Sequence, residues 1–279
     1  MSPRPLPLER GGAGPALMLL HGFTGNGRSL SPIAAALADQ FETLAPDLPG
    51  HGRAGAIAPE GFAATVDQLV ATLESTGRRQ GCWLGYSMGA RLALGCAVRH
   101  PGSVAALVLI GGRAGIADAA ERAARRQSDE ALAGRIEALG MEAFVEEWLS
   151  QPLFATLARR GPAFLEAERR ARLANDPRGL AASLRALGPA AQPPLFDELP
   201  GVRSPVLLVA GALDTRFVEA ARELAQRLPR SELCIVPDCG HAVHLEQPQA
   251  LVQAVREFLH RACDPVPNHY PSSVEETAS

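Results

Sequence analysis

The sequence of 279 residues contains no lysine, so all 27 of its basic residues are arginines. A chain without lysine cannot form a lysine Schiff base with a carbonyl substrate, and it cannot provide the lysine of a Walker-type phosphate loop. The sequence therefore excludes both of these kinds of site. We expect any bound anion to be held by guanidinium groups, whose planar fork matches the geometry of a carboxylate.

Cysteine is also scarce, and no two cysteines form a C-x-x-C pair. The five cysteines are odd in number and scattered along the chain: Cys82, Cys96, Cys234, Cys239 and Cys263. This spacing predicts neither a zinc site nor a disulfide framework, and reduced thiols are the simplest interpretation.

Long apolar runs are absent as well. The stretch 17–20 is far shorter than the roughly 18 residues of a transmembrane helix, and it is too short for the apolar region of a signal peptide. The formal net charge of −3 gives no reason to expect nucleic acid or an anionic membrane as a partner. Since 47% of the residues are hydrophobic and 20% are charged, the composition is that of an ordinary globular protein. We therefore expect a soluble, cytoplasmic protein.

Short strand-like segments alternate with helix-like segments in the first part of the chain and again near its end. The expected strands cover residues 16–20, 42–46, 81–85, 104–110, 206–210 and 232–236. The expected helices cover residues 30–39, 62–76, 90–99, 217–227 and 248–262. Such an alternation is typical of an α/β fold, in which a mostly parallel sheet carries helices on both faces.

The pattern changes over residues 113–192, where helical stretches rich in Ala, Arg, Glu and Leu follow one another without a convincing strand. These stretches are broken near Gly140, Pro152, Pro162, Pro177 and Pro189. We interpret them as an all-helical lid inserted between two parts of one sheet. The predicted organisation is a first core part (1–112), the lid (113–195), a second core part (196–262) and a disordered tail (263–279).

The segment Gly85-Tyr86-Ser87-Met88-Gly89 matches the pattern G-x-S-x-G between an expected strand and an expected helix. In this context the pattern predicts a sharp strand-to-helix turn that lifts a nucleophilic serine out of the sheet. A glycine-rich turn with an ordinary helix-capping serine is the alternative interpretation. The positions of an acid and a base decide between the two.

Asp214 follows the expected strand 206–210, and His241 follows the next strand. The order Ser…Asp…His, with the acid and the base on loops after strands, is that of the α/β-hydrolase fold. We therefore predict this fold, with Ser87, Asp214 and His241 as its catalytic triad. His244 has the spacing of a metal partner for His241, but without further ligands nearby we expect it to be structural.

A glycine-rich loop, His21–Gly25, follows the first apolar strand. In this fold such a loop supplies one amide of an oxyanion hole, here that of Phe23, and the amide of Met88 supplies the other. The alternative is that the loop is merely a turn. A second loop, residues 47–52, we interpret as scaffold.

Arg91 lies in the first turn of the helix that follows Ser87. A cation at this end of a helix opposes the helix dipole, and a local rule broken beside a nucleophile indicates function. The alternative is a surface arginine paired with a neighbouring acid. The expected lid contributes more arginines, most of which we expect on solvated helix faces: Arg122, Arg125, Arg126, Arg169, Arg170 and Arg172.

At this level of detail the chain resembles the 2-succinyl-6-hydroxy-2,4-cyclohexadiene-1-carboxylate (SHCHC) synthase family of menaquinone biosynthesis, from about residue 17 to residue 259. The matching segments are 20–25 (LHGFTG), 47–52 (DLPGHG), 85–91 (GYSMGAR), 125–129 (RRQSD), 148–154 (WLSQPLF), 214–217 (DTRF) and 240–241 (GH). Many hydrolases share the core motifs. Arg91, in the helix after the serine turn, and the two lid segments 125–129 and 148–154 are found in fewer families and are more specific.

Members of that family eliminate pyruvate from 2-succinyl-5-enolpyruvyl-6-hydroxy-3-cyclohexene-1-carboxylate without a metal or an organic cofactor. The resemblance implies that Ser87 is a general base supported by His241 and Asp214, and that no acyl-enzyme forms. The oxyanion hole would hold charge that develops on a carboxyl oxygen beside the carbanion. A substrate with several carboxylates also accounts for an arginine-rich pocket.

Arg91, Arg125 and Arg172 match the carboxylate-binding arginines of the family by position, with Tyr86 and Trp148 beside them. The match of Arg172 runs through a variable helix, in which two neighbouring arginines, at positions 169 and 170, are near substitutes. The chain also departs from some relatives at position 149, where it carries a leucine in place of a second aromatic residue.

The residues alone leave two other functions open. An esterase or a C–C bond hydrolase would use the same triad with Ser87 or an activated water as the nucleophile. A non-catalytic receptor for small molecules would use the scaffold alone. The expected cationic pocket disfavours a neutral ester, and the intact triad disfavours a receptor.

Overall fold

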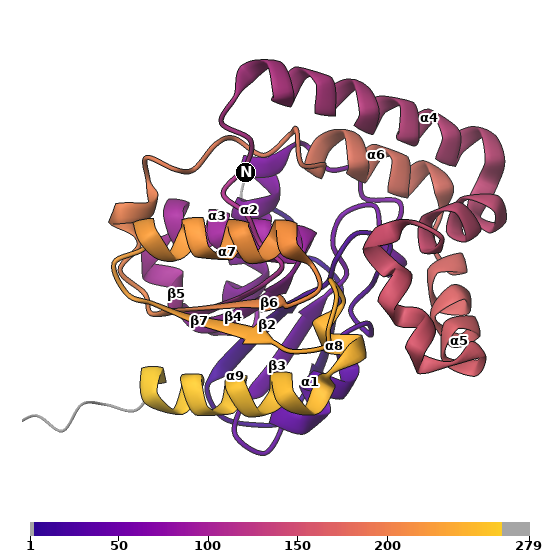
Figure 1. Cartoon of the computed structure of the whole chain (residues 1–279). Coiled ribbons are helices and arrows are strands. Elements are labelled where there is room, and N and C mark those ends of the chain that lie inside the picture. Colours follow the sequence, from indigo (N-terminus) through magenta and orange to yellow (C-terminus); the bar gives the residue numbers. More distant parts are fainter. Residues whose placement is uncertain (1–2, 264–279) are drawn as a thin grey trace, which may run out of the picture.

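A computed structural model describes residues 3–263, so the expected tail lies outside the described residues apart from its first residue. The described chain is built on a seven-stranded sheet in the order β1-β3-β2-β4-β5-β6-β7 (Figure 1). The strands are β1 (Leu8–Gly11), β2 (Ala16–Leu20), β3 (Glu42–Pro46), β4 (Gly81–Tyr86), β5 (Val104–Ile110), β6 (Val206–Gly211) and β7 (Ser231–Val236). All neighbouring strands are parallel except β1, which pairs antiparallel with β3. This confirms the predicted α/β class.

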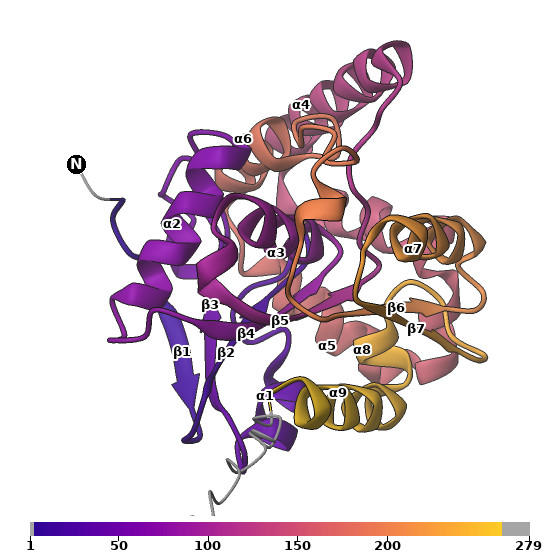
Figure 2. The same ribbon diagram turned by 90° about the vertical axis from the view of Figure 1, so that its left-hand side faces the viewer.

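Helices cover both faces of this sheet, with α2, α3 and α7 on one face and α1 and α9 on the other (Figures 1 and 2). Their bounds are α1 (Ser31–Leu37), α2 (Phe62–Glu74), α3 (Met88–Arg99), α7 (Thr215–Arg227) and α9 (Pro248–Cys263), and the short α8 (Val243–Glu246) precedes α9. In β2, Met18 and Leu20 belong to the core under α2 and α3, whereas Leu17 and Leu19 belong to the core on the opposite face. Because successive side chains of a strand point to opposite faces, a sheet covered on both sides requires the unbroken apolar runs seen in the sequence.

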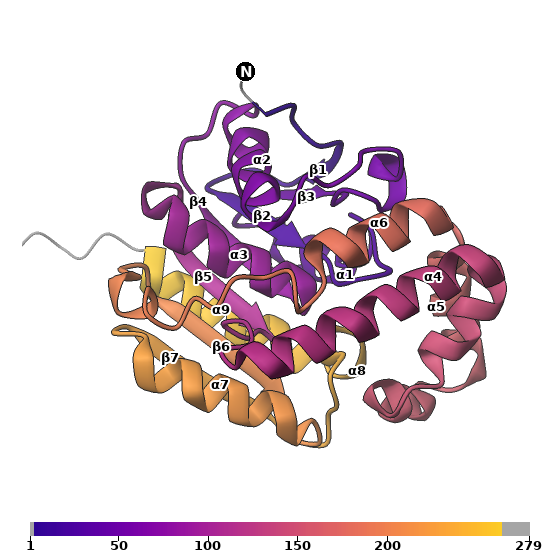
Figure 3. The same ribbon diagram turned by 90° about the horizontal axis from the view of Figure 1, so that it is seen from above.

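The segment between β5 and β6 is a helical insertion without a strand. It contains α4 (Ala119–Leu149), the 3₁₀ helix η3 (Pro152–Arg160), α5 (Pro162–Leu173) and α6 (Pro177–Leu187). Proline stands at the start of the last three, where its missing N–H costs nothing and its fixed φ favours the helix. Gly140 interrupts α4 with φ of 75°, a conformation that favours glycine. The α4 and α6 helices lie side by side over one end of the sheet (Figures 1 and 3) and share their own apolar core.

Within residues 3–263, no helix combines the length and the apolar character needed to cross a membrane.

Candidate active site

Ser87 sits in a sharp turn between β4 and α3. Its backbone has φ of 52° and ψ of −107°, a conformation rare for residues other than glycine. The flanking glycines allow the turn, because a Cβ on Gly89 would lie 2.1 Å from the Leu20 carbonyl oxygen and one on Gly85 would lie 2.3 Å from the Gly89 oxygen. Only glycine fits at these two positions, and the serine side chain is held clear of the sheet.

The structure brings Ser87, His241 and Asp214 into one hydrogen-bonded chain. Nε2 of His241 lies 3.1 Å from Oγ of Ser87, and Nδ1 of His241 lies 2.8 Å from Oδ2 of Asp214. The Asp214 and His241 side chains are both largely buried. In this geometry the carboxylate accepts the Nδ1–H bond, so that Nε2 is left to accept the proton of the serine hydroxyl.

The His241 ring is enclosed on several sides. The rings of Phe217 and Tyr86 lie 4.4 Å and 5.3 Å from it, centroid to centroid, and a Cβ on Gly111 would come within 2.8 Å of its Cε1 atom. Since these groups restrict the ring, its orientation toward the serine is set by packing as well as by Asp214.

Phe23 and Met88, whose amides are the expected donors of an oxyanion hole, both lie at the cavity. Met88 is the first residue of α3, where a backbone N–H has no intrahelical acceptor. The Phe23 amide donates no hydrogen bond to any of the described residues. Both residues line the same cavity as Ser87. The role of the two amides as an oxyanion hole stays a prediction.

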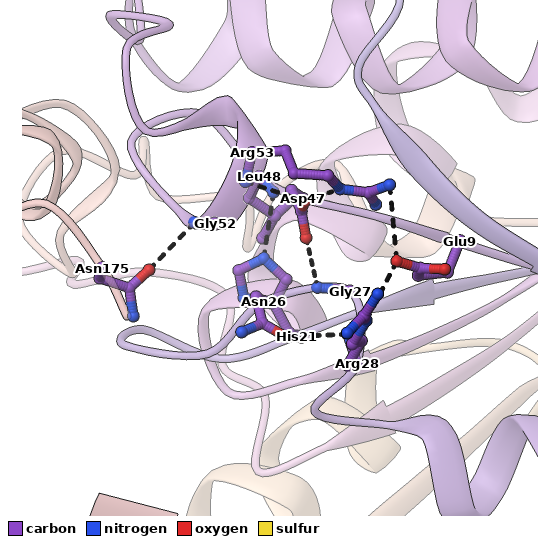
Figure 4. A network of polar contacts seen from close by, with 10 residues as sticks. All are labelled: Glu9, His21, Asn26, Gly27, Arg28, Asp47, Leu48, Gly52, Arg53 and Asn175. Carbon is purple, nitrogen blue, oxygen red and sulfur yellow. Dashed lines mark hydrogen bonds and ion pairs between the residues drawn. The ribbon is translucent and has the colours of Figure 1, made fainter. Parts of the chain in front are cut away.

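A polar network holds the loop that carries Phe23 (Figure 4). Nε2 of His21 accepts a hydrogen bond from the Leu48 amide (3.0 Å), and Oδ1 of Asp47 accepts one from the Gly27 amide (2.6 Å). Asn175, from the helical insertion, accepts from the Gly52 amide and donates to the carbonyl of Thr24. The loop 47–52, interpreted from the sequence as scaffold, thus fixes the loop of the expected oxyanion hole.

A cavity of about 660 Å³ opens above Ser87 and His241, between the sheet and the insertion. Tyr86, Trp148, Phe154 and Phe217 give it aromatic walls, and the indole Nε1 of Trp148 is buried without a hydrogen-bond partner among residues 3–263. Five arginines also line the cavity: Arg91, Arg113, Arg125, Arg135 and Arg216. The site is therefore both aromatic and strongly cationic.

Arg91 is only 6% exposed and makes no ion pair within the described part of the chain. Its guanidinium donates to the backbone oxygens of Leu187 (2.7 Å) and Gly188 (3.3 Å). Burial lowers the pKa of Arg91 to about 9, with a further contribution from the nearby Arg125, so the group is still charged at pH 7. The structure thus keeps a buried cation beside the serine without an acidic partner.

Arg125 reaches the cavity from α4 and forms an ion pair with Asp129, at 2.7 Å. Arg172 is not among the residues that line the cavity, although its charge acts on Tyr86, which does line it, and on His244. Arg172 pairs instead with Glu168, one helical turn away, at 2.6 Å, and its Nε is buried without a partner among the described residues. Its role in carboxylate binding stays a prediction.

The two arginines that were considered as substitutes for Arg172 do not line the cavity either. Arg169 and Arg170 both pair with Glu166 on the surface of α5.

His244 packs its ring 4.2 Å from that of Tyr86, centroid to centroid. Burial lowers the pKa of His244 to about 3, with added repulsion from Arg172 and His241. Residues 3–263 contain no group of three or more His, Cys, Asp or Glu side chains arranged to hold a metal ion. A neutral, buried packing residue is the role that this environment favours.

Arg113 and Arg216 line the cavity but were not singled out from the sequence. Arg113 follows β5, in a loop whose course the sequence pattern does not predict. Arg216 is the second residue of α7, where a cation opposes the helix dipole. The argument that drew attention to Arg91 would therefore have found Arg216 as well.

Residues 15–248 match a family model described as the alpha/beta hydrolase fold. An SHCHC synthase of Enterobacter sp. is 34% identical over 258 residues, which is 91% of this chain and 95% of the relative. A Bacillus subtilis relative carries the same synthase name provisionally, at 36% identity over 250 residues, covering 88% of this chain and 91% of the relative.

Solved structures give the same picture of the fold. The structure of MenH from S. aureus superposes with a TM-score of 0.87 at 27% identity, covering 92% of this chain and 98% of that one. A malate-bound thermophilic esterase from Thermogutta terrifontis superposes with a TM-score of 0.80 at 29% identity, covering 92% of this chain and 93% of that one.

These matches define the class of protein as an enzyme of the α/β-hydrolase fold. The sheet and the sharp turn at Ser87 indicate the same class. Within this class, the chain belongs to the SHCHC synthase family.

Proposed function

We propose that this protein is a cytoplasmic SHCHC synthase, which eliminates pyruvate from 2-succinyl-5-enolpyruvyl-6-hydroxy-3-cyclohexene-1-carboxylate. The observation that carries the proposal is the buried, unpaired Arg91 in the cavity above Ser87. A buried cation without an ion pair is costly even though the charge of Asp129 partly opposes the cost, and a substrate carboxylate offsets what remains. A neutral ester gives such a site no counter-ion. The reaction needs no metal or organic cofactor.

In the proposed reaction the hydroxyl of Ser87 passes its proton to Nε2 of His241 as Oγ takes a proton from a ring carbon of the substrate. Asp214 stabilises the imidazolium that forms. The electron pair left on ring carbon C2 forms a double bond to C3, the existing C3–C4 double bond shifts to C4–C5, and the C5–O bond to the enolpyruvyl group breaks. The proton held by the triad goes to the departing enolate, which becomes pyruvate. The amides of Phe23 and Met88 stabilise the oxygen on which negative charge develops.

Turnover of two substrates tests this function. We expect the purified protein to release pyruvate from the enolpyruvyl substrate, followed by oxidation of NADH with lactate dehydrogenase as the coupling enzyme. We also expect it to hydrolyse simple aryl esters poorly. Rapid ester hydrolysis without pyruvate release would show that the protein is an esterase, the function of its malate-bound structural neighbour.

The Arg91→Gln variant should lower kcat/KM for the polyanionic substrate by about 100-fold, because a charge-assisted hydrogen bond to a carboxylate is lost. Its free energy of unfolding should change little, since the substitution also removes a buried charge that lacks an acidic partner. Steady-state kinetics and urea unfolding measure the two effects.

Arg99→Gln is the matched control for Arg91→Gln. Arg99 lies on the same helix, is exposed and pairs with Asp67, so this variant loses the same charge away from the cavity. A kcat/KM that is the same in Arg91→Gln as in Arg99→Gln would remove the main reason to prefer the synthase over an esterase.

A further inference from the structure

Two of the arginines that line the cavity, Arg113 and Arg216, come from neighbouring loops at one edge of the sheet. Arg113 is the third residue after β5, and Arg216 is the second residue of α7, which follows β6. The β5 and β6 strands are hydrogen-bonded in parallel, so both loops leave the sheet at the same edge. The ring of Phe217, next to Arg216, packs against that of His241, and a Cβ on Gly111, two residues before Arg113, would clash with the same ring. The two guanidinium groups therefore belong to the side of the cavity next to the base.

The other arginines of the cavity are engaged by the protein itself. Arg91 donates to two carbonyl oxygens, Arg125 pairs with Asp129, and Arg135 pairs with Glu147. Each of these three guanidinium groups, on the side toward the helical insertion, is held in place by at least one contact with the protein.

Arg113 and Arg216, by contrast, form no ion pair within residues 3–263, and Nε of Arg113 is buried without a hydrogen-bond acceptor there. Burial lowers the pKa of Arg113, and the charge of Arg216 lowers it further, whereas Glu121 and Glu223 oppose the shift without forming an ion pair. Two like charges that face one cavity, one of them partly desolvated, are unfavourable until an anion binds between them.

We propose that Arg113 and Arg216 form a second carboxylate subsite, which binds a different carboxylate of the ligand from the one at Arg91 and Arg125. That this carboxylate belongs to the substrate rests on the proposed function. The ligand class is a polycarboxylate whose acid groups are separated enough to reach both sides of the cavity. The subsite thus selects for a second acid group on the side of the cavity next to His241.

Binding of simple acids tests the subsite without turnover. The probes are succinate, glutarate and adipate, each compared with the monocarboxylate of the same chain length: butyrate, valerate and hexanoate. Isothermal titration calorimetry on the full chain measures each dissociation constant. For at least one pair, we expect the dicarboxylate to bind the wild type about 10-fold or more tightly than its monocarboxylate, because a second charge-assisted contact forms.

Arg113→Gln and Arg216→Gln should each reduce this preference for the dicarboxylate by about 10-fold or more and leave the monocarboxylates unaffected. The double variant should lose little more than either single variant, because both groups hold one carboxylate. Arg222→Gln, an exposed position on α7 that does not line the cavity, is the matched control and should keep the preference.

Two results would overturn the subsite: a wild type without preference for any dicarboxylate, or a preference that survives both substitutions. Because Arg216 is exposed, its variant tests the proposal even if Arg113→Gln fails to fold. A protein that releases no pyruvate but keeps a preference dependent on Arg113 would refute the proposed reaction and retain the subsite. Pyruvate release without such a preference would support the proposed reaction and refute the subsite.

Discussion

Replacement of Ser87 by alanine should lower kcat for pyruvate release by about 10²- to 10⁴-fold, the contribution of a well-placed general base. The hydroxyl lies 3.1 Å from Nε2 of His241 and lines the cavity, so it is the group through which a substrate proton reaches the imidazole. KM should change little, because the carboxylate-binding arginines remain. Single-turnover measurements with the coupled pyruvate assay separate the chemical step from product release.

The remainder of the triad supplies the comparison for this variant. His241→Gln should lose a similar factor, and the double variant should be hardly worse than either single one, since the two side chains act as a unit. Ser31→Ala, at the exposed start of α1, should match the wild type. Mass spectrometry of the quenched wild-type reaction should find no covalent adduct on Ser87. An acyl-enzyme at Ser87, or a variant that retains most of its activity, would contradict the role as a base.

Acid should destabilise this protein from about pH 6.5 downward, before its carboxylates begin to be protonated, because three histidines are buried in the neutral form. Burial lowers the pKa of His21 to about 4, and it lowers those of His51 and His244 to about 3. The geometry agrees for the first two, since Nε2 of His21 accepts from the Leu48 amide and Nε2 of His51 accepts from the Thr24 amide. A protonated ring cannot accept either bond.

The sign of the effect follows from proton uptake. In the unfolded chain each histidine titrates near pH 6.5, so between about pH 6.5 and 4 the unfolded state binds more protons than the folded state. Stability is therefore full above pH 6.5 and falls as the pH drops. With three such groups the slope approaches about 4 kcal/mol per pH unit, which is enough to exhaust an ordinary domain's stability by about pH 4–5.

Urea unfolding across this pH range measures the slope. His244→Leu removes one of the three proton-binding groups, and it should make the pH dependence shallower and shift acid unfolding to lower pH. His100→Gln, at a half-exposed position on the surface, should leave the slope nearly unchanged. A stability that is flat between pH 6.5 and 5 would contradict this account, because it would show that the folded protein takes up these protons over the same pH range as the unfolded chain.

The sequence predicted the strands well wherever both faces of a strand are buried. The bounds of β2, β3 and β5 agree with the expected ones, because each is a short run in which nearly every residue is buried. The first strand, β1, was not predicted. It lies at the edge of the sheet, is partly exposed and carries Glu9 and Arg10, so it lacks the apolar run that marked the others. The four-residue α8 is too short for its periodicity to be read.

The triad could be predicted because its members follow strands of a parallel sheet, whose carboxyl ends meet at one edge. The surroundings of the individual side chains were harder to predict from the sequence. Arg172 has the family position, yet it pairs with Glu168 one turn earlier in the helix and is not among the residues that line the cavity. Arg113 enters the cavity only because of the turn after β5, where Gly111 has φ of 59°. Such loop geometry depends on tertiary packing, which a local sequence pattern does not encode.

The chain order of the triad has a consequence for how the protein assembles. Ser87 and His241 are 154 positions apart in the sequence. The sheet brings them together because β5, which precedes the helical insertion, pairs with β6, which follows it. The serine and the two amides of the expected oxyanion hole belong to the half of the chain that is synthesised first, and the acid and the base belong to the half that is synthesised last. Such distant contacts form late and slowly compared with local helices. During refolding, the return of activity therefore reports the joining of the two halves of the sheet, and recovered helix content does not.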